Sequence, residues 1–158
     1  MVSKLITRYD NRFNFIKKGS DQIVSNSTTL VDITDMAVVL AANKEYELEF
    51  HMCYDSDLAA DLRMQFNNLS GAVDSILYTM VFYRNTSSSD VIYLERTTPI
   101  EFVLNGDNTN NVNMIAIIRV NTGSSTVTLT PQFAQGTSNA YNSKILADSF
   151  VKVTELIS

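Results

Sequence analysis

A nine-residue segment at 46–54, with the sequence YELEFHMCY, alternates apolar and polar side chains without a break. The apolar members are Tyr46, Leu48, Phe50, Met52 and Tyr54, and the side chains between them are Glu47, Glu49, His51 and Cys53. Successive side chains of a β-strand point to opposite faces of its sheet, so a period of two indicates a strand. We therefore predict a strand here, with one face buried in a hydrophobic core.

Three further segments share this alternation, at 62–66, 100–104 and 127–133. Turn-forming residues separate the apolar runs at 41–44, 67–71, 85–90, 105–111 and 121–125. Short strands between regular turns predict an all-β fold, an antiparallel β-sandwich that is jelly-roll-like and has about eight to ten strands. Pro131 cannot donate to a strand ladder, so we expect an edge or a bulge there.

The segment LAADLRMQFNNL at 58–69 fits two secondary structures. Leu62, Met64 and Phe66 alternate as in a strand, whereas Leu58, Leu62, Phe66 and Leu69 also recur at helical spacing. Two alanines favour the helix. Periodicity alone therefore leaves strand and helix open for these residues.

Two predicted strands, at 75–84 and 112–121, are apolar on both faces. The outward face of an antiparallel sheet normally meets water, so apolar side chains there need a cover. We predict that a second copy of the chain provides it. The candidate interface residues are Leu77, Val81, Tyr83, Ile115 and Ile117. The alternative is that the arms and loops of the same chain cover these strands.

Charge is distributed unevenly along the 158 residues. The net charge is −5, but the first eighteen residues carry five cations against the single acid Asp10, which leaves seven cations and sixteen acids for the rest. The five cations are Lys4, Arg8, Arg12, Lys17 and Lys18. We predict a basic N-terminal arm at 1–18 followed by one β-sandwich domain at 19–158. The arm is either a solvated edge segment or a segment that docks on an acidic neighbour or a sister subunit.

The same charge balance argues against a nucleic-acid partner, because phosphate contacts need clustered cations. No apolar run approaches the roughly 20 residues that span a bilayer, and the first residues do not resemble a secretory signal. We therefore expect no nucleic-acid or membrane partner. Cys53 is the only cysteine, so no internal disulfide is required and assembly in the reducing cytoplasm of a host is allowed.

No catalytic or metal-binding motif stands out. On a strand, His51 and Cys53 share a face about 7 Å apart, too far for a direct hydrogen bond. A metal site would need Glu47 or Glu49 as further ligands. The acids of DSDLAAD at 55–61 lack the glycine and terminal glutamate of a calcium loop. We predict a protein that is no enzyme, with no catalytic residue, metal or cofactor.

Two long segments resemble a family of small head- or tail-associated structural proteins of tailed bacteriophages. The first is SDQIVSNSTTLVDITDMAVVLAANKEYELEFHMCYDSDLAADLRMQF, from Ser20, with a polar stretch, an apolar strand, an AAN-K turn and a long strand. The second is LTPQFAQGTSNAYNSKILADSFVKVTEL, with a final strand, a loop and a returning terminal strand. The chain departs from the family in the segment NNLSGA, where a proline is expected before the glycine, and in having no tryptophan.

The resemblance implies a β-sandwich that assembles, often as a trimer, into projections or decorations of the virion. It favours the strand over the helix at 58–69. We therefore expect a virion structural protein on the particle exterior, a capsid-decoration or head-fibre component that contacts itself and the major capsid or tail proteins. The alternative is a tail-fibre or receptor-binding module whose loops at 85–90 and 105–111 bind host glycans.

Overall fold

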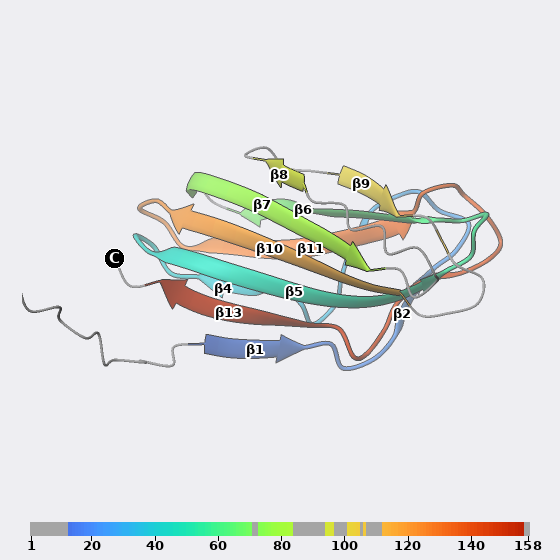
Figure 1. The fold of residues 1–158 in the computed structure, drawn as a ribbon, viewed down its shortest axis with the longest axis horizontal. Helices are drawn as coiled ribbons and strands as arrows, with labels where there is room; N and C mark the ends of the chain where they lie inside the picture. Colours follow the sequence, from blue (N-terminus) through green and yellow to red (C-terminus); the bar gives the residue numbers. More distant parts are fainter. Residues whose placement is uncertain are drawn as a thin grey trace, which may run out of the picture.

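A computed structural model describes residues 13–70, 73–83, 94–96, 101–104, 106 and 112–156, with the backbone alone for 67–70, 80–83 and 94–96. Two antiparallel sheets pack face to face, and the described residues form thirteen strands and no helix. The larger sheet lies in front in Figure 1 and the smaller sheet behind it. The predicted β-sandwich is confirmed. Eight strands have four or more residues, and the remaining five have two or three.

The larger sheet has the strand order β1-β13-β5-β10-β7-β8. These strands are β1 (Phe13–Lys17), β13 (Phe150–Leu156), β5 (Glu45–Ser56), β10 (Val112–Thr122), β7 (Val73–Tyr83) and β8 (Leu94–Arg96). Two short strands extend it, β12 (Ser143–Ile145) on β5 and β2 (Gln22–Val24) on β12. Every pairing among them is antiparallel.

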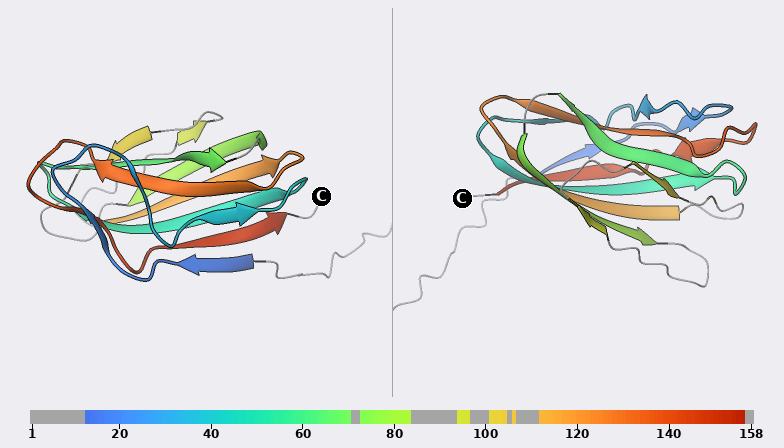
Figure 2. Two further views of the ribbon diagram at one scale, coloured as in Figure 1. Left: turned by 180° about the vertical axis from the view of Figure 1, so that it is seen from behind. Right: turned by 90° about the horizontal axis from the view of Figure 1, so that it is seen from above.

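The smaller sheet has the order β3-β11-β6-β9, with β4 also on β11. Its strands are β3 (Val31–Asp32), β11 (Val127–Gln135), β6 (Leu62–Ser70), β9 (Glu101–Leu104) and β4 (Val38–Leu40). The set β1-β13-β5-β10 of the larger sheet faces β4-β11-β6-β9, which is the arrangement of two Greek keys in a jelly roll. The strands β7 and β8 lie between β6 and β9 in the chain and widen the larger sheet beyond β10 (Figure 2).

The core lies between the sheets and follows the period of two in the sequence. Every second residue of β5 is buried, from Tyr46 to Tyr54, and β10 does the same through Met114, Ala116 and Ile118. Phe66 of the smaller sheet meets Phe50 of the larger one, with ring centroids 5.0 Å apart. Alternation along the chain therefore places one side of each long strand in the core.

The ambiguous segment at 58–69 is a turn followed by a strand. The backbone amides of Ala60 and Asp61 both donate to the carbonyl of Asp57, and β6 begins at Leu62. Leu62, Met64 and Phe66 are all buried, whereas Leu58 lies exposed in the turn. Phe66 is therefore part of a strand and faces the core, as the resemblance implied.

Pro131 lies at an irregularity between β11 and β6. Thr130 pairs with Asn68 and Gln132 with Gln65, so β6 has one residue more than β11 over this stretch. Pro131 cannot donate to the ladder, and a bulge is one place where a strand tolerates this. The predicted bulge at Pro131 is confirmed.

The sheet begins earlier than the sequence suggested. β1 spans Phe13–Lys17 and pairs with β13, so residues that were assigned to the arm belong to the sandwich. Lys18 is only 1% exposed. Its amine donates to Thr34 Oγ1 at 2.9 Å, to the Thr34 carbonyl at 3.3 Å and to Gln22 Oε1 at 3.2 Å. The predicted boundary at residue 18 therefore moves to before Phe13.

Candidate subunit interface

The larger sheet has an outer face, which consists of the side chains that point away from the core. Strand register arranges them in rows that run across the sheet. One row is Lys17, Phe150, His51 and Ile115; the next is Phe15, Lys152, Glu49, Ile117 and Thr79; the third is Phe13, Thr154, Glu47, Arg119 and Leu77. Residues from five strands thus form one continuous surface.

The structure places the described interface candidates on this outer face. The side chains of Leu77, Ile115 and Ile117 are each partly exposed. Val81 pairs with Ile115 and Tyr83 with Asn113, but the side chains of Val81 and Tyr83 lie outside the described part of the chain. Within that part, both views of Figure 2 show two layers and no third layer over the larger sheet. Whether a second copy covers these residues stays a prediction.

Aromatic rings extend this apolar surface to the edge of the sheet. The rings of Phe13 and Phe15 lie 5.4 Å apart edge-on, and Phe15 lies 5.9 Å from Phe150. Phe150 in turn stacks on the imidazole of His51, with ring centroids 4.4 Å apart and ring planes inclined by 11°. Phe15 is 60% exposed. Aromatic residues, phenylalanine among them, are enriched in protein–protein interfaces.

Charged side chains on the outer face are paired with one another. Arg119 Nε lies 3.0 Å from Glu47 Oε2, and Lys152 Nζ lies 3.7 Å from Glu49 Oε2. Partly exposed pairs of this kind add little stability, about 0 to 1 kcal/mol each. Their effect here is on the surface potential, because each of these acids is neutralised by a neighbouring cation.

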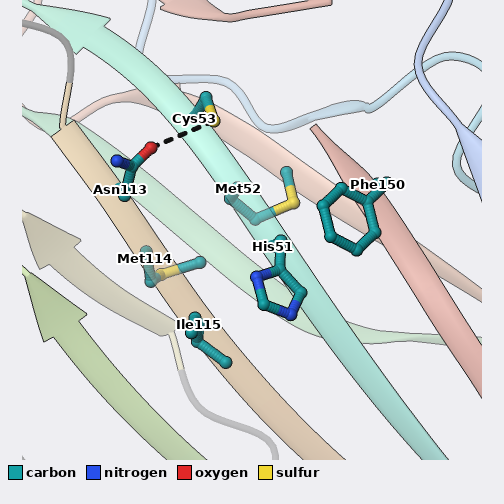
Figure 3. Close-up of a pocket in the computed structure, with 7 residues that line it drawn as sticks. All are labelled: His51, Met52, Cys53, Asn113, Met114, Ile115 and Phe150. Atoms are coloured by element: carbon teal, nitrogen blue, oxygen red, sulfur yellow. Dashed lines mark hydrogen bonds between the residues drawn. The ribbon is translucent and has the colours of Figure 1, made fainter. Parts of the chain in front are cut away.

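A hollow of about 320 Å³ opens on this face beside Phe150 (Figure 3). It is lined by His51, Met52, Cys53, Asn113, Met114, Ile115 and Phe150. Met52 and Met114 are buried and point into the core, so their backbone and side-chain stems form the floor. The walls come from three strands, with His51 and Cys53 on β5, Ile115 on β10 and Phe150 on β13. The hollow is therefore mainly apolar, with polar groups at Asn113 and at the imidazole of His51.

His51 and Cys53 have separate hydrogen-bond partners. His51 Nε2 lies 2.6 Å from Glu49 Oε1, and the Cys53 thiol donates to Asn113 Oδ1 at 3.0 Å. Burial raises the pKa of the Cys53 thiol, and the nearby carboxylate of Asp148 raises it further. The thiol therefore stays protonated at neutral pH and is a poor nucleophile. Among the described residues, no three acids, histidines or cysteines gather as metal ligands would.

The cations of the predicted docking arm have different environments. Lys4, Arg8 and Arg12 lie outside the described residues. Lys17 is exposed on the outer face and pairs with Asp148 at 3.3 Å. Lys18 points inward and is buried, so it is unable to meet a partner and the prediction that it docks is wrong.

Sequence reasoning missed the aromatic edge of this surface. Phe13 and Phe15 were counted within a charged arm, although they occupy every second position of FNFIK, as side chains on one face of a strand do. Phe150 was assigned to a strand, but its position beside His51 depends on pairing between segments a hundred residues apart. The alternation of FNFIK was the one signal in the sequence for this edge.

The loops that were predicted to bind glycans lie almost wholly outside the described residues. Only Gly106 of the segments 85–90 and 105–111 is described. Three tyrosines, Tyr46, Tyr54 and Tyr78, are buried in the core, as expected for strand positions, and Tyr141 is exposed. In the described part of the chain there is also no helix that could cross a membrane.

Comparisons with known proteins identify no family. No protein-family model matches the chain, and no curated protein matches its sequence. One similar solved structure is that of infectious bursal disease virus, Gt strain, with 9% identity and a TM-score of 0.25 over 92% of this chain and 42% of that chain. The VP2 subviral particle of the same virus has 11% identity and a TM-score of 0.24, over 92% and 41%.

A third similar structure is TmCBM61, a carbohydrate-binding module in complex with beta-1,4-galactotriose. It has 12% identity and a TM-score of 0.23, over 89% of this chain and 87% of that chain. The present chain spans about two fifths of the length of the viral chains. With TM-scores below 0.5, none of these similarities decides the function of this chain.

Proposed function

We propose that this chain is a structural protein of a virus particle, a bacteriophage capsid-decoration or head-fibre component, which works by self-association and catalyses no reaction. The outer face of the larger sheet carries the proposal. Ile115, Ile117 and Leu77 lie there partly exposed on β10 and β7. The exposed rings of Phe13 and Phe15 lie on β1, and the rings of Phe150 and His51 connect Phe15 to Ile115. An exposed apolar surface on a folded protein marks an interaction site in most cases.

The N-terminal arm supplies the second part of this proposal. Lys4, Arg8 and Arg12 are three cations within twelve residues, and the chain beyond them is acidic. We expect this shorter arm to attach the oligomer to an acidic surface of a capsid or tail protein, by charge attraction that weakens in salt. The particle exterior comes from the resemblance to phage proteins, and assembly in the host cytoplasm is proposed because a single cysteine requires no oxidising compartment.

Self-association is tested by replacing two apolar side chains of the outer face with acids. In Ile115→Asp/Ile117→Asp, each carboxylate would have to be desolvated in a buried contact, so the oligomer should dissociate to the 17.7 kDa chain. Light scattering at micromolar concentration measures the mass. The control is Val39→Asp, because Val39 is 68% exposed on the other sheet.

A wild-type protein that is a monomer at that concentration would overturn the proposal of self-association. The location is tested separately, by imaging purified particles of the virus that encodes the chain with the protein labelled. Label on the exterior supports the structural role, and absence of the protein from purified particles refutes it.

Receptor binding is the second candidate function. The exposed rings of Phe13 and Phe15 lie next to Lys152, whose amine is 6.0 Å from the Phe13 ring centroid. Aromatic faces beside polar groups are also what a sugar-binding surface requires. A glycan array separates the candidates, because specific hits that disappear in Phe13→Ala/Phe15→Ala would favour receptor binding.

A further inference from the structure

We infer that the Phe15 ring of one copy enters the hollow beside Phe150 of a second copy, and that the contact is reciprocal. This inference rests on the proposed self-association through the outer face, and it specifies which residues meet. The occupant is an identical chain. Three features of the outer face lead to it: an apolar hollow, an exposed ring next to that hollow, and paired charges around both.

The hollow is suited to an apolar side chain. Its volume of about 320 Å³ is near the lower end of ligand-binding clefts, which measure about 300 to 1,000 Å³. Phe150, His51 and Ile115 form one row across three strands, with the rings of Phe150 and His51 stacked, and Cys53 and Asn113 lie farther along β5 and β10 (Figure 3). An aromatic ring that enters would make contacts with aromatic and aliphatic groups and would displace water from them.

Phe15 has the exposure and the position to be that ring. It is 60% exposed, and it projects from the edge strand β1 on the same face as the hollow. The rings of Phe13 and Phe150 both pack against the Phe15 ring in edge-to-face contacts. A ring that is fixed in this way loses little conformational entropy when it is buried.

The positions of Phe15 and the hollow favour a two-fold contact. Only β13 separates β1 from β5, so Phe150 lies between the ring and the hollow. When a protruding side chain and a hollow lie side by side on one face, a two-fold axis between them places the side chain of each copy in the hollow of the other. The first unit of assembly is then a pair, in place of the trimer that the resemblance implied.

The charges around Phe150 allow two identical acidic chains to meet there. Each chain has a net charge of −5, which opposes association in general. On this face Glu49 is neutralised by Lys152 and Glu47 by Arg119, and Lys17 pairs with Asp148. A contact centred on Phe150 therefore brings balanced pairs together, whereas a strongly acidic or basic partner would find no matching charge.

The native thiol of Cys53 gives a direct test, because Cys53 lines the hollow. In Phe15→Cys, mild oxidation should link residue 15 of one copy to Cys53 of the other and yield a covalent dimer on a non-reducing gel. A link within one chain is excluded by distance. Phe15 lies in the same row as Glu49, and Cys53 lies four residues farther along β5, about 13 Å from Glu49. Disulfides need Cα atoms within about 7 Å.

Two variants serve as controls for the cross-link. Phe15→Cys/Cys53→Ser should give no Cys53-linked dimer, and Val39→Cys, on the opposite sheet, should remain uncross-linked. Because removal of the Phe15 ring weakens the proposed contact, a short bis-maleimide is used alongside oxidation.

The reaction of wild-type Cys53 with a thiol reagent adds a measurement that needs no cysteine variant. In the oligomer, Cys53 should react at least about ten-fold more slowly than in Phe15→Ala, because the partner ring covers it. Val39→Ala should leave the rate unchanged. An oligomer with neither the cross-link nor this difference in rate would overturn the inference and leave the proposed function intact. A wild-type monomer would instead refute the proposed self-association itself.

Discussion

At the scale of single residues, buried polar groups differ in whether the fold satisfies them. The buried hydroxyl oxygens of Ser56 and Ser143 lie 2.7 Å from each other and 2.7 and 2.8 Å from the Asp61 carbonyl oxygen, so each hydroxyl has an acceptor for its one proton. Tyr78 is equally buried, but its hydroxyl has no hydrogen-bond partner within the described part of the chain. A buried hydroxyl without a partner costs about 1 to 3 kcal/mol.

Tyr78→Phe should therefore stabilise the protein by about 1 kcal/mol, because it removes an unsatisfied hydroxyl and keeps the ring. Urea denaturation at pH 7 measures the change in the free energy of unfolding. The matched control is Tyr46→Phe, because the Tyr46 hydroxyl accepts a hydrogen bond from the Ala41 amide at 3.2 Å. The control should lose stability. A Tyr78→Phe protein less stable than wild type would contradict the prediction.

The same residue predicts a dependence on alkaline pH. Burial raises the pKa of Tyr78 from about 10 to about 12. Between these values the unfolded chain releases the phenolic proton and the native chain keeps it, so the free energy of unfolding falls as the pH rises. Tyr78→Phe should show a smaller loss of stability between pH 10 and pH 12 than wild type does.

At the scale of elements, β1 is held by one inward side chain and by a polar network at its end. Ile16 packs on the core, while Phe13, Phe15 and Lys17 point outward. Lys18 then reaches Thr34 and Gln22, and Gln22 in turn accepts from the Thr34 amide at 2.8 Å. This network joins the edge of the larger sheet to the chain that leads into the smaller sheet.

Lys18→Ala should destabilise the protein by about 1 to 3 kcal/mol, because it removes the donor to Thr34 Oγ1 and to the Thr34 carbonyl, whereas Gln22 Oε1 keeps the Thr34 amide. Thermal unfolding followed by circular dichroism measures the loss. Lys17→Ala is the control, because Lys17 is exposed and its pair with Asp148 should change the stability by less than about 0.5 kcal/mol. Equal effects of both substitutions would refute the role of the network.

At the scale of the whole molecule, the jelly roll brings the ends of the chain together in one sheet. β1 and β13 are neighbours, so the N-terminal arm starts from the edge next to the aromatic surface. The point where the arm joins the sandwich therefore lies beside the outer face. The β7–β8 extension widens this face on the other side of β10.

Truncation at two points separates the arm from the fold. Removing residues 1–12 takes away only the arm and should leave the melting temperature within about 2 °C of wild type, with attachment to particles lost. Removing residues 1–18 also takes away β1 and Lys18, and should lower the melting temperature by about 5 °C or more, since 1 kcal/mol shifts it by about 2 to 4 °C at this size. Particle binding by the shorter truncation would refute the role of the arm.

The amino-acid sequence determined the fold class and the long strands of this protein. Alternation in segments such as 46–54 is a local property, and it decides which side chains face the core before any pairing is known. The sequence also shows that the strand at 112–121 is apolar on both faces, and this identified Ile115 and Ile117 as outward apolar residues.

The tertiary structure alone decided what depends on pairing between distant segments. The short strands β3 and β12 have two and three residues, too few for a periodic pattern, and form only because β11 and β5 offer them partners. From the sequence alone, Lys18 was assigned to the surface cations of the arm. Only the folded chain brings Thr34 close to its amine. Likewise Phe15, Phe150 and His51 form one surface through register across three strands, and register depends on long-range contacts that a local pattern does not contain.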